Sequence, residues 1–352
     1  MLRILRMGDV EVHRAARPFR ADGRAFEAGD YVIPMHQPYA AFAQTLLEVQ
    51  EYPDLRVYPG GPPRAPYDVT AHTLPLLMDV EARSVEQVEG GVEGVLGDII
   101  DPPAFDFELP PALRGEDAPR VALYKSWQEP MEAGWTRWVF DQYRLAYDTL
   151  HNADIRAGGL GERFDVILLQ DQSARSIAEG YPASVVPAPY AGGLGEEGAR
   201  ALEAFVREGG RIVAIESATD YVIDLFGLDV ANAVERLPEQ DFYVPGSILQ
   251  IELDGTHPIA RGLGGTSPAW YWRSSRAFDV GEPAARVIAR YGAENPLLSG
   301  WILGPEYLSE KPALVEVPVG EGSVVLFGFQ PNYRAQTVAT WPLLFNALSE
   351  GR

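Results

Sequence analysis

Short apolar runs alternate with segments of helical periodicity over the last two thirds of the chain. Buried strands are predicted at 121–127, 165–170 and 211–217, because each is an apolar run too short for a helix. Helices are predicted within 135–143 and 192–210, where apolar side chains recur at helical spacing. Since crossover helices join parallel strands, we expect the three strands to be adjacent and parallel in a doubly wound sheet with helices on both faces.

The first third of the chain has a different pattern. Residues 9–35 alternate polar and apolar positions, and Asp22-Gly23 is a strong signal for a hairpin turn. A helix is expected next, and a stretch rich in proline, glycine and acidic residues follows it. The pattern indicates a small α+β region with a linker over 1–117 and an α/β domain over 118–352.

The segment 211–227, RIVAIESATDYVIDLFG, predicts a buried strand that turns abruptly into an amphipathic helix. In several hydrolase and amidotransferase folds such an elbow presents a nucleophile beside the N–H groups of the helix end. Here the corner is Glu216-Ser217. A serine nucleophile needs a base, and His257 is the only histidine after the elbow. A negative Glu216 would oppose an oxyanion, so we expect Ser217 to cap the helix, with a Ser217–His257 pair as the catalytic alternative.

Composition removes several kinds of chemistry. The 352 residues carry a formal net charge of −21 and no run of basic residues, which argues against binding to nucleic acid or to an anionic membrane. There is no cysteine, so disulfides and cysteine nucleophiles are excluded. None of the five histidines has the spacing of a zinc-peptidase motif, so no metal or cofactor site is expected. No apolar stretch is long enough to span a membrane or resembles a signal peptide, and we expect a soluble chain.

Aromatic and basic residues are concentrated in the segment 268–278, PAWYWRSSRAF. Trp270, Trp272 and Arg273 are candidates for a platform on which a carbohydrate or a peptide stacks. The same residues are equally suited to packing at an interface between domains or subunits. The sequence leaves both interpretations open.

Several long segments resemble the region that follows the catalytic domain in large bacterial zinc-carboxypeptidase-like metallopeptidases. These segments include YKSWQEPMEAGWTRWVFDQY, PYDVTAHTLPLLMDV and VLFGFQPNYRAQT. Residues 119–352 also resemble the class I glutamine-amidotransferase-like fold, which is a flavodoxin-like three-layer domain. In active amidotransferases the corner residue is a cysteine with a nearby histidine, whereas Glu216 stands at that position here, beside Ser217.

The resemblance implies an accessory or binding region without catalytic activity of its own. Its expected partner is a zinc-carboxypeptidase-like catalytic domain, in the same or a separate chain, because the zinc-binding motif is missing from this sequence. The long members of the group look exported, which suggests an extracytoplasmic location and leaves the compartment open. Two other functions stay open: a serine-dependent hydrolase that uses Ser217, and a carbohydrate- or peptide-binding module that uses the segment 270–278.

Overall fold

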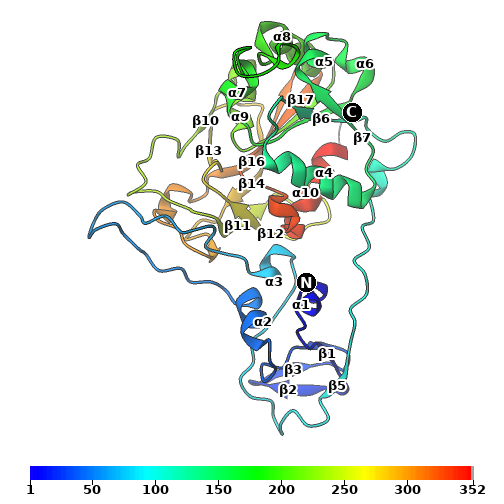
Figure 1. Cartoon of the computed structure of the whole chain (residues 1–352), viewed down its shortest axis with the longest axis vertical. Coiled ribbons are helices and arrows are strands. Elements are labelled where there is room, and N and C mark those ends of the chain that lie inside the picture. The colour runs from blue at the N-terminus through cyan, green and yellow to red at the C-terminus, as the bar shows by residue number, and fades with distance from the viewer. Residues whose placement is uncertain (350–352) are drawn as a thin grey trace.

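A computed structural model describes residues 1–349, and its main feature is one ten-stranded mixed sheet (Figure 1). Five strands are parallel, in the order β7 (Tyr147–His151), β6 (Val121–Lys125), β8 (Val166–Leu169), β9 (Arg211–Ile215) and β17 (Gly322–Phe327). The sheet continues beyond β17 with antiparallel strands, namely β16 (Pro312–Val319), β14 (Arg286–Tyr291), β11 (Ser247–Leu253) and β12 (Thr266–Tyr271), and β15 (Leu297–Ser299) also pairs with β11.

The three strands predicted from the apolar runs are confirmed as adjacent and parallel, since β8 pairs with both β6 and β9. All four residues of β8 are buried, as is typical of a parallel strand covered on both faces. Numbered along the chain, the parallel strands have the order 2-1-3-4-5, which flavodoxin-like domains share. The α/β class predicted for this part of the chain is therefore confirmed.

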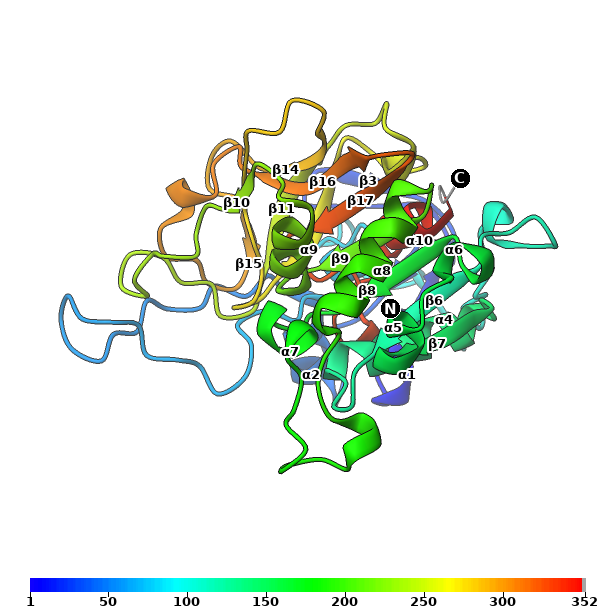
Figure 2. The same cartoon turned by 90° about the horizontal axis from the view of Figure 1, so that it is seen from above.

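Helices cover both faces of the parallel strands, and alternate strand residues face each layer. On one face α4 (Met131–Tyr143) and α10 (Trp341–Ser349) pack with Leu168 and Ile215. On the other face α5 (Asn152–Arg156), α8 (Gly195–Arg207) and α9 (Ala218–Phe226) pack with Leu169 and Ala214. Figure 2 shows α8 and α9 beside the strands that they cover. None of the helices in residues 1–349 combines the length and apolar character needed to cross a bilayer.

The N-terminal region forms a small separate sheet at the lower end of Figure 1. Its central strand β1 (His13–Ala15) lies between β4 (Tyr31–Val32) and β5 (Leu96–Ile99), and both pairings are antiparallel. The predicted hairpin is confirmed: β2 (Phe19–Ala21) and β3 (Arg24–Phe26) are joined by Asp22-Gly23, both at positive φ (48° and 76°). Helices α1 (Leu2–Met7) and α2 (Ala40–Leu47) belong to the same region.

After α2 the chain reaches the large domain at two places, around Gln50 and over residues 68–77, where α3 (Leu74–Leu77) contacts β12; the loop between them projects away from the large domain (Figure 1). The chain thus reaches the large domain well before residue 117, the boundary expected from composition. Hydrogen bonds between this segment and the large domain join Thr70 to Ser247 (2.9 Å), Gln50 to Ser299 (2.9 Å) and Asp68 to Arg334 (2.7 and 2.8 Å).

Candidate functional site

The elbow predicted within 211–227 is present between β9 and α9. Its corner residue, Glu216, has φ of +50°, a backbone conformation that residues other than glycine rarely adopt. The backbone N–H of Glu216 donates to the carbonyl of Phe327 (2.8 Å), which extends the pairing with β17 by one residue. Its carbonyl accepts from the hydroxyl of Thr219 (2.6 Å) in the first turn of α9. The surrounding structure thus holds the strained turn in place.

The Glu216 carboxyl is enclosed by protein. Only 1% of the residue is exposed, Ser275 Oγ lies 2.5 Å from Oε1, and the Gln330 side-chain amide donates to Oε2 (3.3 Å). Burial raises the pKa of Glu216 well above its ordinary value, and the negative charges of Asp171 and Glu132 raise it further. At the nucleophile's position the elbow therefore holds a buried carboxyl group whose raised pKa favours its neutral form.

A second carboxylate accepts a hydrogen bond from the backbone N–H of Ser217, the residue that follows the corner. Asp171 lies just after β8, and its Oδ1 accepts the backbone N–H of Ser217 (3.0 Å). In a hydrolase elbow the N–H of the residue after the nucleophile is an oxyanion-hole donor. Here an internal carboxylate already uses that donor, at a helix N-terminus where negative charge is favourable.

The prediction that the Ser217 hydroxyl caps α9 is wrong. Ser217 has helical backbone angles (φ −61°, ψ −24°), and its side chain makes no capping hydrogen bond. A residue whose side chain caps a helix needs extended backbone angles, and the strained conformation of Glu216 places Ser217 one step too far into the helix. Asp171 supplies the acceptor instead.

Ser217 and His257 are not brought together, so the proposed catalytic pair is wrong. His257 is buried, and its Nε2 lies 3.1 Å from Glu316 Oε2. Glu316 also pairs with Arg211 (2.7 Å), which begins β9, whereas Ser217 lies beyond the other end of that strand. Five strand residues span about 16 Å, so an imidazole at one end of β9 is out of reach of a hydroxyl at the other.

The aromatic segment 268–278 packs inside the protein. Trp270 is 1% exposed and stacks on Tyr333 with ring centroids 4.1 Å apart. Trp272 is partly buried, and Arg273 donates to the hydroxyl of Tyr243 (3.0 Å). The structure therefore supports packing rather than an open stacking platform for the two tryptophans, whereas Arg273 is exposed and bonded to Tyr243.

Polar residues that the sequence interpretation did not single out surround the elbow. They follow the carboxyl ends of parallel strands, where open α/β sheets bind ligands. The motif Gln170-Asp171-Gln172 comes directly after β8, and Gln330-Pro331-Asn332 begins three residues after the end of β17; these positions were a usable signal. We define the carboxyl-edge cluster as Glu132, Gln170, Asp171, Glu216, Gln330 and Asn332.

Several buried atoms of the carboxyl-edge cluster have no hydrogen-bond partner among the described residues. Gln170 is 2% exposed, and both atoms of its side-chain amide are without a partner. The side-chain carbonyl oxygens of Gln330 and Asn332 are also buried and unpartnered. Such groups are costly to leave unsatisfied, so they indicate a place for ordered water or for polar atoms of a ligand.

Two exposed aromatic rings lie beside the strand ends at this edge. Trp127, which follows β6, stacks on Tyr190 with centroids 4.3 Å apart, and the residues are 45% and 52% exposed. The neighbouring Ser126 hydroxyl accepts from the side chain of Gln172 (2.8 Å), so the ends of β6 and β8 are linked. In the 2-1-3-4-5 order this is the point where the strand sequence reverses, the usual ligand position in such sheets.

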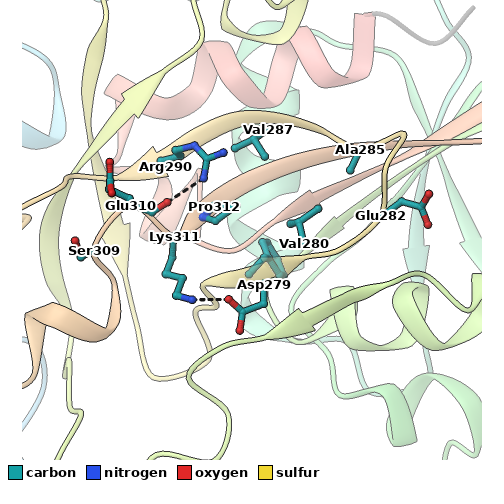
Figure 3. Close-up of a pocket in the computed structure, with 11 residues that line it drawn as sticks. Asp279, Val280, Glu282, Ala285, Val287, Arg290, Ser309, Glu310, Lys311 and Pro312 are labelled. Atoms are coloured by element: carbon teal, nitrogen blue, oxygen red, sulfur yellow. Dashed lines mark hydrogen bonds and ion pairs between the residues drawn. The ribbon is translucent and has the colours of Figure 1, made fainter.

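A cavity of about 450 Å³ lies elsewhere, lined by β13 (Phe278–Val280), β14 and the residues around the start of β16 (Figure 3). Its two cations are engaged within the protein: Lys311 pairs with Asp279 (2.5 Å), and Arg290 donates to the carbonyl of Glu310 (3.0 Å). None of its lining residues belongs to the elbow. In residues 1–349 no group of three His, Cys, Asp or Glu side chains is arranged to hold a metal ion.

No protein-family model matches the chain, and no curated protein matches it. Among solved structures it is similar to a β-galactosidase from Bacillus circulans sp. alkalophilus (14% identity, TM-score 0.38), covering 64% of this chain and 30% of that one. It is also similar to a cytoplasmic protein from Salmonella typhimurium (14% identity, TM-score 0.40, 64% and 97% covered). A third likeness is to a GMP synthase-like protein from Thermoplasma acidophilum (10% identity, TM-score 0.39, 66% and 94% covered). At such identities a likeness concerns the fold alone.

Proposed function

We propose that this chain is a non-catalytic accessory domain with a class I glutamine-amidotransferase-like fold, which binds a ligand at the carboxyl edge instead of hydrolysing one. One observation carries the proposal: carboxyl groups occupy both positions that acyl-transfer chemistry needs at the elbow. Glu216 stands at the position of the nucleophile. Asp171 accepts the backbone N–H of Ser217, which is the oxyanion-hole donor in a hydrolase elbow.

The chemistry of these groups supports the same conclusion. A neutral carboxyl group is a poor nucleophile, and a carboxylate beside the donor N–H repels a developing oxyanion. A serine at this elbow would also need a base, and the histidine that follows it in the chain is bound to Glu316 at the opposite end of β9. The elbow therefore retains the geometry of a catalytic turn without its chemistry.

The accessory role follows from the sequence resemblance to the region downstream of zinc-carboxypeptidase-like catalytic domains. We propose that such a domain is the partner, in the same or a separate chain. To test this partnership, this chain is mixed with the catalytic domain of a zinc-carboxypeptidase-like enzyme from the same genome and passed over a size-exclusion column. Co-elution in equal amounts supports the partnership, and separate elution at micromolar concentration rejects it.

The absence of hydrolysis is tested directly on the purified chain. We expect no labelling by an acyl-serine probe and no turnover on a panel of ester and amide substrates. Ser217→Ala is the matched control, because it removes the only hydroxyl at the corner. Turnover in the wild-type chain that disappears in Ser217→Ala, while the variant still melts normally, would overturn the non-catalytic assignment.

A further inference from the structure

Residues 53–67 form an arm that projects from the large domain. Both ends of the arm are fixed to that domain. The backbone N–H of Tyr52 donates to the carbonyl of Gly300 (3.1 Å), and Asp68 forms an ion pair with Arg334 (2.7 Å). Between these two anchors the arm extends away from the rest of the chain in both views (Figure 1, Figure 2).

The arm is an ordered hairpin. Within it, backbone N–H groups donate to carbonyls from Arg64 to Leu55 (2.7 Å), from Val57 to Pro62 (3.1 Å) and from Gly61 to Tyr58 (2.8 Å). The tip is Pro59-Gly60, and Gly60 has φ of +74°, as a type II turn requires. Among residues 1–349, no hydrogen bond joins the arm to another part of the chain. Five of its fifteen residues are proline, so the arm loses little conformational freedom when it binds.

The hairpin exposes apolar side chains. Val57 and Tyr58 are 63% and 61% exposed, and Tyr67 is fully exposed. None of the three belongs to a hydrophobic core cluster of the described residues. With about seven residues on each side, the hairpin reaches roughly 20 Å beyond its anchors. An ordered, projecting hairpin with an apolar tip is suited to docking on a second molecule.

The charge of the arm is opposite to that of the rest of the chain. The arm carries Asp54, Arg56 and Arg64, a net charge of +1, so the other residues carry −22 of the total of −21. Arg56 pairs with Asp54, whereas Arg64 is exposed and has no ion pair among the described residues. Repulsion between two whole copies is screened beyond about 8 Å at 0.15 M ionic strength, so charges at the contact decide. The acidic surface of a second copy therefore complements the arm.

The large domain offers an aromatic surface at the carboxyl edge. Trp127 and Tyr190 are the one contacting ring pair in residues 1–349 in which both residues are more than a third exposed. Met131, which is 75% exposed, begins α4 four residues after Trp127, and the acidic Glu132 follows it. Exposed aromatic rings are the surfaces on which P-x-x-P segments dock, and residues 63–66 of the arm, PRAP, have this spacing.

We propose that the arm of one copy docks on the Trp127–Tyr190 pair of a second copy, and that the reverse contact forms at the same time. Two-fold symmetry makes each contact occur twice in such a dimer. This inference rests on the proposed binding function and names the occupant of the carboxyl edge, a proline-rich hairpin of the partner copy. The site at that edge is then complete only in the dimer.

Sedimentation equilibrium of the purified chain at about 0.15 M ionic strength, without added ligand, tests the dimer. We expect a reversible monomer–dimer equilibrium in the micromolar range, as for a small interface. The double variant Val57→Ser/Tyr58→Ser and, separately, Trp127→Ala should each weaken dimerisation about tenfold or more, because aromatic anchors dominate interfaces. Val92→Ser, at a valine 48% exposed in the small N-terminal region, is the matched control and should change it by less than about twofold.

A mixture of the two variants separates docking from a structural effect. The arm variant keeps an intact ring pair, and Trp127→Ala keeps an intact arm. A mixed dimer therefore retains one of its two contacts, whereas a dimer of either variant with itself retains none. With one partner fluorescently labelled, the mixed pair should associate about threefold or more tightly than either variant with itself. Circular dichroism and thermal melting establish that both variants are folded.

Several results would overturn the proposal. One is a chain that stays monomeric at high micromolar concentration, and another is a mixed pair no tighter than the variants alone. Dimerisation that depends on Val57 and Tyr58 but not on Trp127 would reject the docking site as well. None of these measurements involves an added ligand or a substrate. Failure of the dimer therefore leaves the test for hydrolysis untouched, and the two proposals fail separately.

Discussion

Replacing Glu216 by glutamine should stabilise the protein, and increasingly so as pH rises. The folded state favours the neutral form of this carboxyl, because burial and then the charge of Asp171 raise its pKa well above the ordinary value. For an acid with a raised folded pKa, the stabilising contribution is complete below the unfolded pKa, about 4.3, and is lost as pH rises through the folded pKa. Glutamine does not titrate and still offers Gln330 and Ser275 a hydrogen-bonding partner.

The size of the effect follows from linkage. Between the unfolded and the folded pKa of Glu216, the unfolded chain releases a proton that the folded chain keeps. The free energy of unfolding of the wild type therefore falls relative to Glu216→Gln by about 1.4 kcal/mol per pH unit. Over two pH units within this window the difference grows by about 2.7 kcal/mol. Urea denaturation of both proteins at intervals from pH 4.5 to about 8.5 measures it directly.

Two further variants sharpen the assay. Ser217→Ala changes the neighbouring residue without removing a titratable group, so its effect on stability should be small and independent of pH. Asp171→Asn removes the charge that acts on Glu216, so the window in which stability falls should become narrower. A difference between Glu216→Gln and wild type that stays constant across the pH range, or that favours the wild type as pH rises, would show that Glu216 is ionised in the folded state.

Three other substitutions test the remaining assignments. Glu216→Cys introduces the only thiol of the chain. Adding Asp171→Asn should speed the reaction of this thiol with a small alkylating reagent by about threefold for each unit by which the thiol pKa falls. An unchanged rate would show that the charge of Asp171 does not act on the elbow. His257→Ala should lower the free energy of unfolding by about 1–3 kcal/mol, because Glu316 loses a buried hydrogen bond; a cost under about 0.5 kcal/mol in a denaturant titration would contradict that role. Trp270→Ala should lower the free energy of unfolding by about 3–5 kcal/mol in a denaturant titration, as expected for a core residue. A decrease under about 1 kcal/mol would favour a surface role for Trp270 instead of packing in the core.

The three central parallel strands, β6, β8 and β9, were predictable because their signals are local, whereas β7 and the parallel pairing of β17 with β9 were not predicted. A buried parallel strand such as β8 is a continuous apolar run, and the crossover rule then restricts how neighbouring strands are arranged. The elbow was visible for the same reason, since strand and helix periodicity meet at Glu216. The hairpin at Asp22-Gly23 depends only on two residues that accept positive φ.

The possible pairing of Ser217 with His257 failed because of the topology of the sheet. Three successive antiparallel pairings, from β17 through β16 and β14 to β11, make β11 run opposite to β9. Residues that follow β11, His257 among them, therefore lie at the amino edge of the parallel strands, away from the elbow. The β16–β17 hairpin is local, but the other two pairings join strands that are well separated in the sequence, so no local pattern reports the direction of β11.

The role of Asp171 was hidden for a different reason. A carboxylate one residue beyond a buried strand is compatible with a metal, a substrate or a helix N-terminus, and the choice depends on which helix begins beside it. Here α9 begins after the neighbouring strand, and the backbone N–H of Ser217 at its start donates to Asp171. Only the tertiary structure shows that the oxyanion-hole donor is already occupied.

The ionisation states of the two carboxyl groups at the elbow, Asp171 and Glu216, are coupled. Asp171 lies at the helix N-terminus, where a negative charge is favoured, and that charge helps to keep the buried Glu216 neutral. A neutral Glu216 leaves Asp171 and the partly buried Glu132 as the acids available to a ligand at this edge. A ligand cation beside Asp171 would offset its charge and so lower the pKa of Glu216. By linkage, binding of such a ligand and protonation of Glu216 would depend on one another, so an affinity that changes with pH is the result expected if the proposed binding function is right.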